Sequence, residues 1–156
     1  MSLDAIDTHI LNLLQQDAGL SVSEIAERVN LSQPPCWRRI RKLEEGGYIE
    51  RRVALLNRKK LGLNVVVYAE VKLTANGRQA VGAFEDKIRS FPEVTECYVM
   101  LGQSDFLIRI VARDVDGYEQ FFRQHLSQLP GVQDITSSVA LSEVKYSTEL
   151  PIDPSA

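Results

Sequence analysis

The sequence contains few of the residues that build disulfide frameworks, metal sites or membrane spans. Of its 156 residues only Cys36 and Cys97 are cysteines, and they do not form a CxxC pair, so we expect two buried, reduced thiols and no metal site. Apolar runs such as NVVVYAEV, from Asn64, are shorter than the roughly 20 residues of a membrane span. The first ten residues lack the pattern of a signal peptide. We therefore expect a cytoplasmic protein without membrane contact.

The sequence also lacks the arrangements typical of phosphate-binding and catalytic proteins. The GxxxxG-like spacing around Gly77 and Gly82 has no Lys-Ser/Thr pair, which a P-loop requires. His9 and His125 are far apart and have no neighbours arranged as a base and a nucleophile. We therefore expect no enzyme, no catalytic residues and no cofactor.

The charges are distributed unevenly along a chain whose formal net charge is -3. Residues 1–60 contain 10 lysines and arginines against 8 acidic residues, whereas residues 61–156 contain 8 against 13. Within residues 34–60 the difference is larger, with nine basic against three acidic residues. Such asymmetry indicates that one part of the chain faces a polyanion.

The first third of the chain has the apolar spacing of three short helices. The stretch LDAIDTHILNLLQQD repeats apolar residues at helical intervals. Ser21 and Glu24 have the spacing of a capping box at the start of a second helix. Asn30 fits a left-handed turn, and Pro34 and Pro35 suit the first turn of a third helix.

The third helix has one apolar and one basic face. Cys36, Ile40 and Leu43 share one side, and the opposite side carries Pro34, Arg38, Arg41 and Lys42. Two short helices joined by a tight turn, the second with an arginine face, form a helix-turn-helix that fits the major groove of DNA. The alternation in YIERRVALL predicts a small hairpin, or wing, with Trp37 packed under it. The alternative to DNA binding is that the basic residues of the third helix form a solvated face without a partner.

The remaining chain predicts an α+β domain with the order β-α-β-β-α-β. Strands are predicted in VVVYAEVKL, VTECYVML, DFLIRIVAR and PGVQDITSSVALSEVK, and helices in GRQAVGAFEDKIRSF and DGYEQFFRQHLSQL. This order is that of the ferredoxin-like split unit, an antiparallel sheet with both helices on one face. We expect its other face to carry Val65, Val67, Tyr98, Met100 and Leu107, or their alternating neighbours, and to mediate self-association.

With both halves considered, the chain resembles the Lrp/AsnC family of transcription regulators, also called feast/famine regulators. The resemblance lies in LDAIDTHILNLLQQDAGLSVSEIAERVNLS, CWRRIRKLEEGGYI, ALLN, LGQSDFLIRI and LPGVQDITSSVALSEVK. It implies a winged helix-turn-helix DNA-binding domain over residues 1–56, a linker over 57–63, and an effector-binding and oligomerisation domain over 64–156. It also implies homodimers that assemble into tetramers or octamers and bind a free amino acid between dimers.

The candidate site residues fall into two groups. The side chains expected to contact double-stranded DNA are Ser32, Gln33, Pro34, Arg38, Arg39, Arg41, Lys42, Arg51 and Arg52. The resemblance implies an effector site formed by Gly102, Gln103, Ser104, Asp105, Thr136, Ser137 and Ser138. In that site Asp105 would accept a hydrogen bond from the ammonium group of the amino acid, or it would fix its own turn. Gln103 departs from the commonest loop pattern, G-D-x-D. A nonspecific architectural DNA-binding protein that responds to no ligand is the second interpretation.

Overall fold

A computed structural model describes residues 3–153, which form two compact units. The first unit contains residues 3–55 together with the C-terminal segment 145–153, and the second contains residues 56–144. Residues 57–63, expected as a linker, group with the second unit, and the last segment groups with the first. The chain therefore passes between the two units twice.

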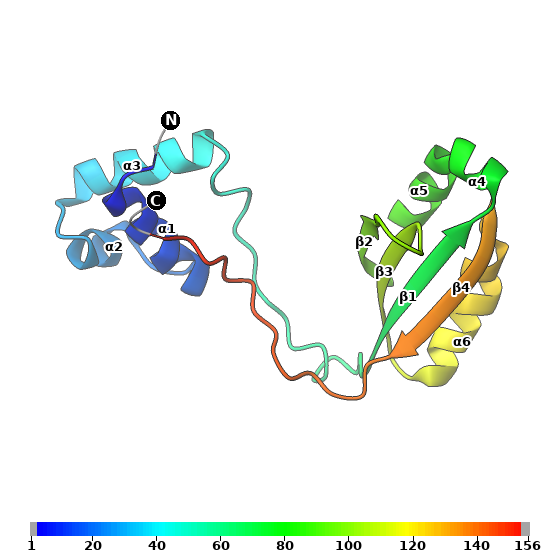
Figure 1. Cartoon of the computed structure of the whole chain (residues 1–156). Coiled ribbons are helices and arrows are strands. Elements are labelled where there is room, and N and C mark those ends of the chain that lie inside the picture. The colour runs from blue at the N-terminus through cyan, green and yellow to red at the C-terminus, as the bar shows by residue number, and fades with distance from the viewer. Residues whose placement is uncertain (1–2, 154–156) are drawn as a thin grey trace. The chain divides into compact units, whose positions relative to one another are not determined.

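The first unit is built from three helices, α1 (Ala5–Gln16), α2 (Val22–Arg28) and α3 (Gln33–Glu45) (Figure 1). Asp4 and Asp7 form a capping box at α1, and Ser21 and Glu24 form the predicted capping box at α2. Asn30 has a φ of 54°, which confirms the left-handed turn before α3. Each reciprocal cap satisfies backbone N–H groups that have no partner inside the helix.

The three helices share one apolar core. Its buried members are Ile10, Leu14, Ile25, Ala26, Val29, Cys36, Ile40 and Leu43. Because α3 contributes Cys36, Ile40 and Leu43, the predicted apolar face of this helix is confirmed.

The expected wing is absent from the part of the chain that the structure describes. Residues 46–49 form turns and bends, residues 50–57 form neither helix nor strand, and the described strands all belong to the second unit. An isolated two-stranded hairpin is marginal in water without a surface to bury one face. Val53, Leu55 and Leu56 are exposed and provide no such burial.

The C-terminal segment is held to α1 by a two-point contact. The side-chain amide of Gln15 donates to the backbone oxygen of Leu150 at 3.1 Å. Its oxygen accepts from the backbone N–H of Leu150 at 2.8 Å. Gln15 therefore ties Leu150 to α1, in the unit to which this segment belongs.

The second unit is the predicted antiparallel sheet with helices. The strands are β1 (Val65–Leu73), β2 (Val94–Val99), β3 (Phe106–Ala112) and β4 (Val132–Val139), in the spatial order β2-β3-β1-β4. All neighbouring pairs are antiparallel, which is the ferredoxin-like arrangement. The helices are α4 (Ala75–Gln79), α5 (Val81–Arg89) and α6 (Val115–Gln124), followed by the 3-10 turn η1 (Leu126–Gln128). The single helix predicted over 77–91 is interrupted at Ala80.

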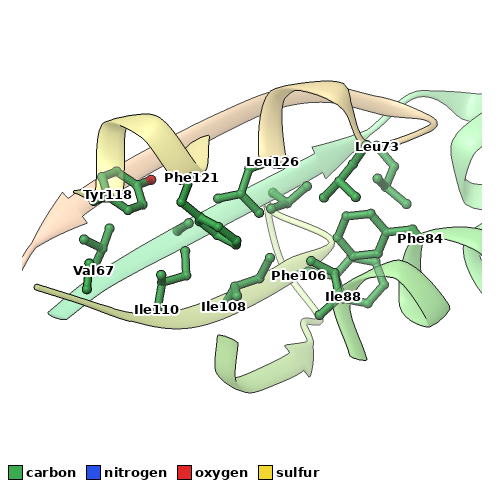
Figure 2. Packing of buried hydrophobic residues seen from close by; sticks show 14 residues of the cluster. Val67, Leu73, Phe84, Ile88, Phe106, Ile108, Ile110, Tyr118, Phe121 and Leu126 are labelled. Carbon is green, nitrogen blue, oxygen red and sulfur yellow. The ribbon is translucent and has the colours of Figure 1, made fainter. Parts of the chain in front are cut away.

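One face of the sheet carries the core. Figure 2 shows Tyr118 and Phe121 of α6 over Val67 and Ile110. At the other end Phe84 and Phe106 lie with ring centroids 4.5 Å apart. Alternate residues of each strand point to the same face, so this packing determines what the opposite face presents.

The opposite face is partly apolar, and in β1 it carries the alternating neighbours of Val65 and Val67. Val67 is fully buried on the helix-covered side, so in β1 the open face carries its alternating neighbour Tyr68. Val65 is partly buried and packs against the same core. Tyr68 and Tyr98 are exposed, and Leu107 lies opposite Tyr98. Self-association across this face stays a prediction.

The two cysteines differ in burial. Cys36 is fully buried in the helical core, as expected. Cys97 is exposed, which corrects the prediction of a buried thiol. It lies on the edge strand β2, where α5 leaves an open concavity of about 340 Å³.

Two glycines allow α4 to approach the start of β4. A Cβ placed on Gly77 would lie 2.8 Å from the Cα of Gly131, which has a φ of +75°. The adjacent backbone N–H of Thr74 donates to the oxygen of Gly131 at 2.8 Å. Contact between two backbones leaves no flexible side chain that could move aside.

We expect Gly77→Ala to lower the free energy of unfolding by about 2 kcal/mol, because the methyl group overpacks a backbone contact. Gly82→Ala is the matched control, since a Cβ at Gly82 meets nothing within 4 Å. It should change the free energy by less than about 0.5 kcal/mol. Urea unfolding followed by circular dichroism measures both, and equal effects would contradict the assigned contact.

Candidate nucleic-acid interface and effector site

The outward face of α3 carries the basic residues expected to bind DNA. Pro34, Arg38, Arg41 and Lys42 are all exposed, opposite the buried stripe of the same helix. Within residues 3–153 neither Arg38 nor Lys42 forms an ion pair. Their charges are therefore not neutralised by neighbouring acidic groups.

Arg41 of this face and Arg52 beyond the helix form exposed ion pairs. Arg41 lies 3.2 Å from Glu45, and Arg52 lies 3.0 Å from Glu44. Exposed pairs of this kind contribute at most about 1 kcal/mol, so a phosphate can compete for either guanidinium. Arg51 is exposed in the segment where the wing was expected.

Arg39 points in a different direction from the other basic residues of α3. Its Nη1 donates to Asp4 Oδ2 and to Asp7 Oδ1, both at 2.7 Å. The Asp7 side chain is 6% exposed, and a buried carboxylate needs such a partner. The sequence placed Arg39 at the phosphates, whereas this geometry gives it a structural role between α1 and α3.

The same contacts shift the pKa values of two of these groups. The backbone N–H of Asp7, and then the guanidinium of Arg39, hold the pKa of the Asp4 carboxyl below its usual value. Hydrogen bonds to Asp7 and Asp4 raise the pKa of Arg39. Both shifts favour the charged forms and therefore the folded state at neutral pH.

The start of α3 presents two polar residues of the candidate set. Ser32 is the N-cap residue, is exposed, and makes no side-chain cap hydrogen bond. Gln33 donates from Nε2 to the Ser23 hydroxyl of α2 at 3.1 Å, which joins the two helices of the motif. Helix N-termini are common places for contacts to phosphate oxygens.

Trp37 lies on the outward side of α3 and not beneath a wing. Its side chain is 51% exposed, and the guanidinium carbon of Arg41 lies 5.7 Å from the ring centroid. The expectation that Trp37 packs under the wing was wrong, because no wing forms in residues 50–57.

The candidate effector loop connects β2 to β3. Gly102 and Gln103 are exposed, and Ser104 and Asp105 are half-buried. Asp105 Oδ2 accepts from the backbone N–H of Leu73 at 2.7 Å, and its own N–H donates to the oxygen of Val71 at 2.9 Å. Asp105 therefore fixes the loop against the end of β1.

Arg78 is a residue of this region that the sequence analysis missed. Its Nη1 lies 3.5 Å from Asp105 Oδ1, and about half of its side chain is exposed. The loop consequently has a cationic group beside an anionic one. Only the fold reveals this pair, because the two residues lie on different elements.

The three hydroxyl residues of β4 divide between the two faces of the sheet. Ser137 lies opposite Ala69 on the helix-covered side, and its hydroxyl pairs with that of Tyr118 at 2.5 Å. Thr136 and Ser138 lie opposite Glu70 and Tyr68 on the open side. The structure thus brings Asp105 to the end of β1 and Thr136 to the neighbouring edge strand.

The described residues contain neither a candidate metal site nor a helix that could span a membrane. Within residues 3–153, no group of three or more histidine, cysteine, aspartate or glutamate residues could hold a metal ion. No helix in this range is long and apolar enough to cross a membrane.

The helical unit and its outward basic face define a helix-turn-helix DNA-binding protein, and the second unit is a separate α+β domain. Comparison with known families agrees with both parts. Residues 3–50 match the winged helix-turn-helix DNA-binding family, and residues 66–150 match the Lrp/AsnC ligand binding domain.

Individual relatives cover nearly the whole chain. It is 38% identical to the DNA-binding transcriptional activator DecR of Escherichia coli, over 97% of this chain and 99% of the relative. It is 36% identical to the leucine-responsive regulatory protein of the same species, over 96% and 92%. A Neisseria meningitidis transcriptional regulator, solved as an L-Met complex, superposes with a TM-score of 0.92 at 34% identity, over 96% and 97%.

The chain belongs to the Lrp/AsnC family. It is a DNA-binding transcriptional regulator with a ligand-binding domain. The predicted helix-turn-helix followed by a ferredoxin-like α+β domain is confirmed.

We expect Arg39→Ala to lower the free energy of unfolding by about 2 kcal/mol, because it leaves the buried Asp7 carboxylate without its cation. Arg38→Ala removes the neighbouring arginine without breaking an ion pair and should change stability by less than about 0.5 kcal/mol. Urea unfolding of both variants at pH 7 measures the difference. Equal stabilities would show that Arg39 has no structural role.

The stabilising effect of the Asp4 pair should also depend on pH. Because the folded-state pKa of Asp4 lies below 3.8, its contribution is complete above that value and is lost as the pH falls through the folded pKa. The stability difference between wild type and Arg39→Ala should therefore stay constant from pH 7 to about 5 and shrink in more acidic solution. A difference that grew toward low pH would contradict the assignment.

Proposed function

We propose that this protein is a sequence-specific regulator of genes for amino-acid metabolism or transport, and that a free amino acid modulates it. The observation that carries the proposal is the outward basic face of α3, which leaves Arg38 and Lys42 without acidic partners in residues 3–153. Family membership supports the regulatory role, and the relatives named above are transcription regulators and not enzymes. We propose that it acts in the cytoplasm, where its DNA lies.

In the proposed complex, α3 lies in the major groove. Gln33, Arg38 and Arg41 lie nearest the bases, since guanidinium and amide groups can bind base edges with two hydrogen bonds. Ser32, Lys42, Arg51 and Arg52 lie nearer the phosphates and position the helix. A homodimer would place two such helices in successive major grooves of a near-palindromic site.

The effector proposal rests on the loop that Asp105 fixes at the end of β1. An amino-acid zwitterion needs an acceptor for its ammonium and donors for its carboxylate. Asp105 supplies the acceptor, and Arg78, 3.5 Å away, supplies a guanidinium donor. Gly102, Gln103 and Ser104 add loop groups, and Thr136 and Ser138 would contribute from the facing dimer. The Ser137 hydroxyl pairs with Tyr118 on the helix-covered side and is not included in the proposed site. The L-Met complex of the Neisseria relative supports an amino acid as the ligand.

The ligand would act on assembly. If it binds between dimers, its affinity differs between the dimer and the tetramer or octamer, and it shifts their populations. That shift changes the spacing of the α3 helices presented to DNA.

We expect Arg38→Ala to weaken binding to a selected duplex by about 1–3 kcal/mol and to relax its sequence preference, because a base contact is lost. Arg51→Ala should weaken binding to all sequences similarly and reduce the salt slope by about one. Fluorescence anisotropy at several salt concentrations measures both effects. Arg123→Ala, an exposed arginine of α6 paired with Glu119, is the control. Unchanged affinity in Arg38→Ala would remove that residue from the interface.

The same titrations test the architectural alternative. A nonspecific DNA-binding protein loses affinity steeply with salt but distinguishes little between sequences, whereas a specific regulator prefers its operator by about a thousandfold or more. A preference below about tenfold would support the alternative.

For the effector, we expect calorimetric titration with the proteinogenic amino acids, beginning with L-Met and L-Leu, to find at least one ligand. Arg78→Ala should abolish its binding, because the carboxylate loses its cation. Arg89→Ala, which removes an exposed arginine of α5 paired with Glu85 and Asp86, is the matched control. Binding of none of the amino acids would contradict the effector proposal and leave DNA binding untouched.

A further inference from the structure

The DNA-facing side of α3 also holds an apolar concavity, which the arginine pattern does not explain. It has a volume of about 490 Å³ and is lined by Val22, Gln33, Pro34, Trp37 and Arg38. We name it the Trp37 concavity. Val22 comes from α2 and the other four residues from α3, so the helix-turn-helix motif itself forms it.

Trp37, the only tryptophan of the chain, is exposed in this concavity. A half-exposed indole next to Pro34 and Val22 leaves a contiguous apolar surface in contact with water, and such a surface marks a place of interaction. Tryptophan combines a large apolar face with one hydrogen-bond donor, which suits an interface that is partly dry and partly wet.

The rim of the concavity is cationic. Arg38 forms part of its wall and has no ion pair within residues 3–153. Arg41 lies over the indole at 5.7 Å from the ring centroid and holds it by a cation–π contact. A matching occupant is therefore an apolar group that belongs to a negatively charged polymer. The concavity is also continuous with the basic face of α3 that is proposed to bind DNA.

Duplex DNA offers one group of this description in its major groove. The edges of the bases there are donors and acceptors, apart from the 5-methyl group of thymine. An apolar hollow bordered by arginines matches a methyl group that lies among phosphates and polar base edges.

We propose that the Trp37 concavity receives the 5-methyl group of a thymine in each half-site of the operator, so that Trp37, Pro34 and Val22 read thymine by apolar contact. This inference rests on the proposed DNA-binding function, to which it adds a specificity-determining contact.

Removal of single methyl groups from the DNA tests the proposal without changing the protein. A duplex is first selected from random sequence with the full-length protein, and each thymine is then replaced in turn by deoxyuridine. At one position of each half-site we expect about a fourfold loss of affinity, the amount for burial of one methyl group. If the wild-type protein binds no duplex, the proposed function fails. If it binds but no replacement weakens binding, or if the selected half-sites lack thymine, only this inference is overturned.

Variants then assign the effect to the indole. Trp37→Ala should lose a similar factor on the thymine duplex and bind both duplexes equally, whereas Trp37→Phe should retain part of the discrimination. Lys42→Ala is the contrast, since loss of a phosphate contact weakens binding to both duplexes and leaves the discrimination intact. Discrimination that persists unchanged in Trp37→Ala would overturn the assignment.

The emission of Trp37 gives a third readout, which needs no variant because the chain has no other tryptophan. Saturation with the thymine duplex should change its intensity and move its maximum to shorter wavelength, and the deoxyuridine duplex should produce a smaller shift. Emission unchanged at full occupancy would show that the indole stays in water and would overturn the proposal.

Discussion

The pairing of Arg39 with Asp4 and Asp7 determines which side of α3 faces outward. This contact joins α3 to the first turn of α1 at 2.7 Å on both carboxylates, while Cys36, Ile40 and Leu43 fill the core below. Arg39 is therefore engaged within the protein. Rotation of α3 about its axis would bury charged side chains and expose apolar ones. The fixed rotation leaves Arg38, Arg41 and Trp37 on the outward side.

Features set by residues close in the sequence were predictable, and features set by distant contacts were not. The capping box at Ser21, the turn at Asn30 and the buried stripe of α3 depend on spacings of a few residues. The partners of Arg39 lie 32 and 35 residues away, so helical periodicity alone grouped it with the DNA-binding arginines. The wing was predicted from alternation alone, but alternation cannot show whether a hairpin has a surface to pack against.

A similar division applies to the second unit. The element order predicted the ferredoxin-like sheet, because alternating apolar residues and amphipathic helices specify this architecture. The geometry of the loop at 102–105 could not be predicted from the sequence, because it depends on contacts between distant residues. Asp105 accepts from the backbone N–H of Leu73 and lies beside Arg78. A carboxylate that orders its own loop can also accept an ammonium group, because it has lone pairs for several donors. The two roles offered by the sequence are therefore compatible.

The central claim is that the outward face of α3 reads the major groove. Methylation interference on a selected duplex tests it most directly, because dimethyl sulfate modifies guanine N7 in the major groove and adenine N3 in the minor groove. The account predicts that N7 methylation blocks binding at two clusters separated by one helical turn, about 10 base pairs, or a multiple of it. Interference confined to adenine N3 would show minor-groove binding and contradict the account.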